Sequence, residues 1–168
     1  MRTKFGAGLV GAMALVVATG AKADDCADLF AAATAQAKTP YDGTVTTVKK
    51  SGETTKNEVV VLGAKMYIQV AGAWQSMPYD AQGTADDMMA KAKTTKPTCQ
   101  KVGSDTVNGE ATTVFTEHAE TPRGASDVRL WVSDSRHLPL KMEIHLPSGD
   151  VITQETHYDN VKAPAGVN

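Results

Sequence analysis

Residues 137–146 read HLPLKMEIHL, and this stretch decides the fold. Its apolar side chains stand at every second position, which is typical of a β-strand with one packed face and one wet face. Pro147 and Gly149 then occupy positions that suit a type I turn starting at Leu146. The pattern therefore predicts an antiparallel hairpin between 137–146 and a closing strand at about 151–160.

The register of this hairpin follows from its turn. It places Ile144 opposite Ile152 on the packed face and Lys141 opposite Glu155 on the wet face, where opposite charges stabilise the pair. Upstream, the chain contains segments rich in threonine and valine, which favour β-strands, and glycine-containing turns separate these segments. They predict further strands at about 43–50, 55–62, 65–70, 73–77, 99–105, 110–119 and 126–134.

Two helices are expected beside these strands. Asp24 and Asp25 suit the start of a helix, since their carboxylates accept from free N–H groups, and Pro40 ends it. A second short helix is expected at about 84–93, with Thr84 as its capping residue. The predicted fold class is α+β, a curved antiparallel half-barrel of about 8–9 strands covered by an N-terminal helix and one inserted short helix.

The first 23 residues have the pattern of a cleaved signal peptide. A short basic start precedes an apolar run, and Ala21-Lys22-Ala23 is a small-x-small cleavage site. We expect cleavage after Ala23, export to the periplasm, and a single domain over 24–168 whose tail is poorly ordered from about residue 162. The GxGxxG at 6–11 lies in the removed segment, where a dinucleotide-binding unit cannot form.

Charge and cysteine count restrict the partners. The chain has 17 basic and 19 acidic residues, and removal of 1–23 takes away three basic residues and no acidic one. The mature chain thus carries 14 basic against 19 acidic groups, a net charge of −5, which argues against nucleic acid. No second apolar stretch is long enough to span a bilayer. Cys26 and Cys99 are the only cysteines and predict a disulfide in an oxidising compartment.

Four late motifs carry a family resemblance. They are LWVS at 130–133, HLPLKME at 137–143, SGD at 148–150 and YDNV at 158–161. With the order of the elements, they resemble the periplasmic lipoprotein-carrier family, the half-barrel of lipoprotein-sorting and related envelope lipid-binding proteins. The resemblance implies a non-enzymatic protein that holds a lipid or a lipoprotein acyl chain between sheet and helices.

Ten apolar residues are candidates to line such a cavity. Methionines suit this role because they adapt to varied ligands. The alternatives are that these residues simply pack together, or that the protein is a periplasmic adaptor that binds a partner through a face around Trp74 or Trp131. The ten candidates are Leu29, Phe30, Met66, Ile68, Val70, Met88, Met89, Leu140, Met142 and Ile144.

Catalytic and metal motifs are not apparent. The sequence has no G-x-S-x-G, H-E-x-x-H, P-loop or EF-hand pattern, so we expect no enzyme activity and no cofactor. His137, His145 and His157 fall on the wet face of the last hairpin, with His137 facing Asp159 and His157 facing Pro139. We interpret them as solvated side chains rather than metal ligands, and we expect a monomer.

Overall fold

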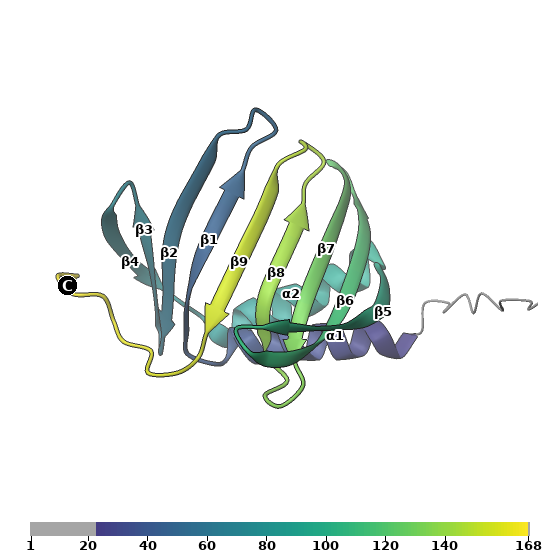
Figure 1. Cartoon of the computed structure of the whole chain (residues 1–168), viewed down its shortest axis with the longest axis horizontal. Helices are drawn as coiled ribbons and strands as arrows, with labels where there is room; N and C mark the ends of the chain where they lie inside the picture. The colour runs from purple at the N-terminus through teal and green to yellow at the C-terminus, as the bar shows by residue number, and fades with distance from the viewer. Residues whose placement is uncertain (1–22, 168) are drawn as a thin grey trace, which may run out of the picture.

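The computed structural model describes residues 23–167. The predicted signal peptide and the GxGxxG segment therefore lie outside the described residues, apart from Ala23. Two helices and nine strands are present in this part of the chain (Figure 1). The helices are α1 (Ala23–Ala37) and α2 (Ala81–Thr95). The strands are β1 (Tyr41–Val48), β2 (Thr54–Leu62), β3 (Lys65–Val70), β4 (Ala73–Pro78), β5 (Thr98–Val107), β6 (Glu110–Thr121), β7 (Gly124–Ser133), β8 (Pro139–His145) and β9 (Val151–His157).

All nine strands form one antiparallel sheet in the order β4-β3-β2-β1-β9-β8-β7-β6-β5. Neighbouring strands are hairpins, except that the last strand, β9, pairs with the first, β1. The sheet stays open, with β4 and β5 as its two edges. The predicted α+β half-barrel with two helices is therefore confirmed.

The last hairpin has the predicted register. Ile144 lies opposite Ile152, and Lys141 lies opposite Glu155. The predicted turn is present as well, since the Gly149 N–H donates to the Leu146 carbonyl at 2.9 Å.

Helix α1 closes the core over one half of the sheet. Leu29 and Ala32 pack against Phe115, Leu130 and Val132, all of them buried. The helix is tied at its first turn, because Cys26 and Cys99 form the predicted disulfide, with 5.0 Å between their Cα atoms. This bond joins the start of α1 to the edge strand β5.

Helix α2 is longer than the 84–93 expected from the sequence. It starts after Asp80, whose side chain accepts from the Gly83 N–H at 3.0 Å. Thr84, the expected cap, instead donates its hydroxyl to the Asp80 carbonyl at 2.7 Å. An aspartate acceptor three residues before a free N–H is a strong N-cap, so the helix begins one turn earlier. It ends at Thr95, and the following C-cap residue, Lys96, has a left-handed backbone before Pro97.

Both helices lie behind the β5–β8 half of the sheet in Figure 1. Their main contacts are with each other and with these strands. Strands β2, β3 and β4 extend beyond the helices on the other side. One half of the sheet is thus packed under helices, and the other projects as a wing.

The edge strand β5 curls over the opposite, outer face. A bulge between Lys101 and Gly103 shifts its register with β6, and Figure 1 shows the strand curving across the lower ends of its neighbours. The Trp131 indole N–H donates to the Asp105 carboxylate at 3.0 Å. Trp131 is therefore only 6% exposed, and its predicted role as an exposed docking residue is wrong.

Candidate functional site

The face of the sheet that looks toward the helices can be followed from strand to strand. Directly opposed residues in antiparallel strands share one face. Met142 packs against the core beneath α1, and its neighbour across the β8–β9 pair is Gln154. Gln154 in turn lies opposite Val45, and Val45 lies opposite Asn57. We call this side the inner face.

Beyond β9 the inner face stays apolar but loses its helical cover. Val59 and Val61 are buried near the lower end of β2, whereas Val70 is 47% and Met77 41% exposed near the free edge. We define the wing surface as the apolar inner-face residues of β1–β4. It comprises Val45, Val59, Val61, Met66, Ile68, Val70 and Met77.

A polar seam separates the wing surface from the packed core. The side-chain amides of Gln36 on α1 and Gln154 on β9 both donate to the Thr156 hydroxyl, each at 3.3 Å. Tyr41 and Tyr158 stand beside them, with ring centres 6.4 Å apart. Burial raises the pKa of Tyr41 to about 12 and that of Tyr158 higher still, so both phenols stay neutral. The seam therefore offers neutral hydrogen-bonding groups next to apolar surface.

The ten predicted cavity residues fall into different environments. Leu29, Phe30 and Met142 belong to the packed core. Leu140 is buried and borders a hollow of about 250 Å³ at the lower end of the sheet. Met66, Ile68 and Val70 lie on the wing surface, and Ile144 is half-buried on the inner face of β8.

The two methionines of α2 complete the ten. Met88 is half-buried, and Met89 is 41% exposed. The sequence did not single out Val45, Val59, Val61 and Met77, although each stands at an alternating position of its strand. The alternation of apolar residues was visible in the sequence. The face of the sheet on which these four residues lie could not be assigned without the strand pairing.

One acidic residue lies on the inner face. Glu117 follows two residues after Phe115 and is opposed by Cys99 on one side and Val128 on the other. Burial among these neighbours raises the pKa of its carboxyl above the usual range.

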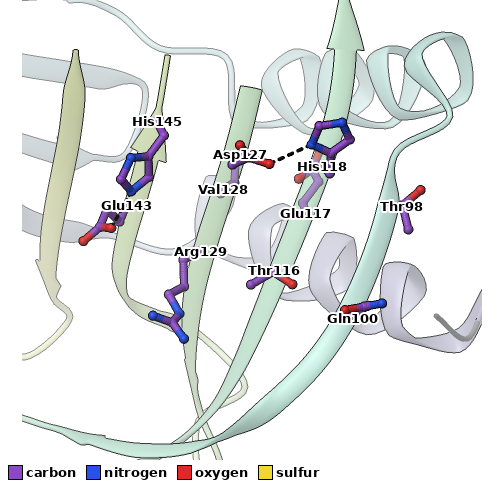
Figure 2. A pocket seen from close by; sticks show the side chains of 10 residues that line it. All are labelled: Thr98, Gln100, Thr116, Glu117, His118, Asp127, Val128, Arg129, Glu143 and His145. Atoms are coloured by element: carbon purple, nitrogen blue, oxygen red, sulfur yellow. Dashed lines mark hydrogen bonds and ion pairs between the residues drawn. The ribbon is translucent and has the colours of Figure 1, made fainter. Parts of the chain in front are cut away.

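The outer face carries a hollow of about 550 Å³ over β5–β8. Figure 2 shows its polar side chains, with two histidine–carboxylate pairs at its upper end. The Nδ1 atom of His118 lies 2.7 Å from Asp127, and the Nε2 atom of His145 lies 2.7 Å from Glu143. The hydrogen bonds of His118 to Asp127 and then to Glu120 raise the pKa of its imidazole above the usual value. The outer-face residues that line it are Thr98, Gln100, Thr116, His118, Asp127, Arg129, Glu143 and His145, and it is also bordered by Glu117 and Val128, which stand between them along β6 and β7.

His137 lies just before β8, and His157 ends β9. Asp159, predicted to face His137, accepts two hydrogen bonds from the adjacent Arg136, each 3.0 Å long. His157, predicted opposite Pro139, lies 3.6 Å from Asp42 on its other side, where β9 pairs with β1. Across residues 23–167 no three side chains of metal-binding type form a group that could hold an ion.

Comparison with known proteins supports a shared fold. No protein-family model and no curated protein matches the sequence. Among solved structures, lipoprotein LppX of Mycobacterium tuberculosis has 12% identity and a TM-score of 0.53, with 84% of this chain and 100% of that chain covered. LprF from Mycobacterium bovis has 14% identity and a TM-score of 0.49, with 89% and 98% covered. MucB has 17% identity and a TM-score of 0.47, with 84% of this chain but 61% of that chain covered.

At such identities the likeness concerns the fold alone. Of these three structures, LppX is the one with a TM-score above 0.5. Within residues 23–167 no helix is both long and apolar enough to cross a bilayer. The chain therefore shares the curved-sheet fold of the lipoprotein LppX, in agreement with the fold that the sequence indicated.

Proposed function

We propose that this protein is an exported, non-enzymatic envelope protein that binds a lipid or a lipoprotein acyl chain on the wing surface. The observation that carries the proposal is the apolar inner face of β1–β4, which extends beyond the two helices and keeps Val70 and Met77 substantially exposed. An apolar sheet face of this kind is stabilised when an apolar partner covers it.

The energetics favour an acyl chain as that partner. Each methylene moved from water to an apolar surface contributes about 0.8 kcal/mol. Met66 and Met77 lie opposite each other on β3 and β4 and provide flexible, polarizable side chains that adapt to a chain of variable shape. The neutral seam at Gln154 and Tyr41 offers hydrogen bonds to the polar end of such a molecule.

The compartment follows from independent features. The disulfide between Cys26 and Cys99 suits an oxidising environment, and residues 1–23 have the pattern of an export signal. LppX, which shares the fold, is itself a lipoprotein. These features support a place in the periplasm.

The test measures whether the protein binds a lipid and whether the wing surface is the binding site. Native mass spectrometry of gently purified mature protein should show a co-purifying lipid, and a dansylated fatty acid should bind with increased fluorescence. Val70→Thr should weaken probe binding about fivefold, since it removes about 1 kcal/mol of apolar contact. Val102→Thr is the matched control, because Val102 is 45% exposed on the opposite edge strand.

Equal binding by both variants would place the ligand away from the wing surface. A clean apo mass together with no probe binding would favour the adaptor alternative, in which the protein binds a partner and no lipid. The packed core around Leu29, which is 3% exposed beneath α1, is the observation in favour of that alternative.

A further inference from the structure

The two edges of the sheet differ in how they are protected. The edge strand β5 has a bulge, carries Lys101 and Asp105, and is tied to α1 through Cys99. The Lys101 backbone N–H also donates to the Asp25 carboxylate at 3.0 Å. Bulges, charges and cover are the usual means by which an edge strand avoids pairing with another chain.

The edge strand β4 lacks these features. Its sequence, AWQSMP, contains no charged residue, and its six residues pair with β3 in unbroken register. Pro78, at its last position, is its only device against further pairing. No backbone hydrogen bond joins β4 to the C-terminal segment in the described part of the chain.

The free main-chain groups of β4 can be identified from its ladder. The Tyr79 N–H donates to the Ala64 carbonyl at 2.9 Å, directly beyond the last pair of β3 and β4. Because the direction of these groups alternates along a strand, Met77, Gln75 and Ala73 also bond toward β3. The N–H and C=O groups of Trp74 and Ser76 therefore point away from the sheet.

We propose that β4 pairs antiparallel with β4 of a second copy of this chain, with Gln75 at the two-fold axis. In this register Trp74 of each copy lies opposite Ser76 of the other, so all the free N–H and C=O groups of these residues form hydrogen bonds. A register centred on Ser76 would place Trp74 opposite Pro78, which has no N–H to donate. Of these two registers, the one centred on Gln75 pairs all the free groups of Trp74 and Ser76.

A second copy fits this edge for two reasons. The strand is uncharged, so pairing it with itself opposes no like charges. The two inner faces also become continuous, and Met77 of one copy comes opposite Ala73 of the other. The contact is isologous and closes as a dimer. Because the paired segment is short, we expect a weak, concentration-dependent dimer rather than the monomer expected from the sequence.

Sedimentation analysis of the mature protein from low micromolar to millimolar concentration tests the dimer. Gln75→Glu places two carboxylates opposite each other at the axis and should remove the dimer. Ser104→Glu adds the same charge on the other edge, where Ser104 is exposed, and should leave the dimer unchanged. Melting curves confirm that both variants stay folded.

A cross-link tests the register separately. Gln75→Cys should form a disulfide-linked dimer under mild oxidation, because directly opposed, non-hydrogen-bonded residues bring their Cα atoms to about 4.5 Å. Ser104→Cys should not form one. A monomer at millimolar concentration, or a dimer that persists in Gln75→Glu, would overturn the proposal. Because these measurements need no lipid, they stand apart from the proposed function.

Discussion

Loss of the disulfide between Cys26 and Cys99 should be the most damaging covalent change to this fold. The bond joins the first turn of α1 to the edge strand β5, and Cys99 is 1% exposed. α1 contributes Leu29 and Ala32 to the core, so the bond holds in place the helix that buries this part of the sheet. Without it, the helix is held by side-chain packing and by the hydrogen bonds of Asp25 and Gln36.

The magnitude follows from the loop that the bond closes. The two cysteines are 73 positions apart in the sequence. On the chain-entropy model, closing a loop of this length stabilises the folded state by about 4 kcal/mol. Domains of this size are stable by about 5–15 kcal/mol in total, so the loss is a large share. It corresponds to a fall in Tm of about 15 °C.

The assay compares urea unfolding of oxidised protein, of protein reduced with a thiol reagent, and of a Cys26→Ala/Cys99→Ala double variant. The reduced protein keeps both sulfur atoms and reports the loss of the cross-link itself. The double variant should be less stable than the reduced protein by a further about 1–2 kcal/mol, since the buried Cys99 site then loses its side chain. A loss below about 1 kcal/mol on reduction would refute the loop-closure reasoning.

Three further changes test the packing and the proposed function. Gly43→Ala should destabilise the fold by more than about 3 kcal/mol in urea unfolding, because its Cβ would collide with the Glu155 carbonyl oxygen across the β1–β9 pair. Glu117→Gln should raise Tm at neutral pH, since the raised carboxyl pKa means that stability falls as pH rises through it. The two proteins should melt alike at a pH well below the usual carboxyl range, and a difference that persists there would contradict this origin. If the ligand lies under α2 and not on the wing surface, replacing Met88 and Met89 with Ser should weaken dansylated fatty-acid binding more than it lowers Tm, because α2 would then act as a lid. Strong hydrogen-exchange protection of α2 amides, equal to that of β8, would instead make the helix a fixed part of the core.

The strand pairing could be predicted where local signals agree. In the last hairpin, the alternation of apolar residues and the turn at Pro147 and Gly149 gave one register, and the structure has it. Asn108 and Gly109 both have positive φ, as a two-residue hairpin turn between β5 and β6 requires, and Asn-Gly is the residue pair that favours such a turn. These features depend only on residues close in sequence.

Other features depend on residues far apart and had no local signal. Trp131 resembles an exposed aromatic residue on a wet face until β5 bends at its bulge and brings Asp105 over the indole. The contact of His157 with Asp42 likewise comes from the pairing of the first and last strands. Neither the bulge in β5 nor the pairing of β1 with β9 produces a periodic pattern of residues in the sequence.

The dimensions of the elements explain why the predicted cavity residues divide into two groups. A helix of 15 residues, the length of α1, is about 22 Å long, whereas nine strands spaced at about 4.8 Å span about 38 Å. A helix that crosses these strands therefore covers little more than half of the inner face. The disulfide to β5 fixes which half, because it anchors the start of α1 at that edge. Substitutions beneath α1, such as at Leu29, should therefore reduce stability, while substitutions on the wing surface, such as at Val70, should change ligand binding.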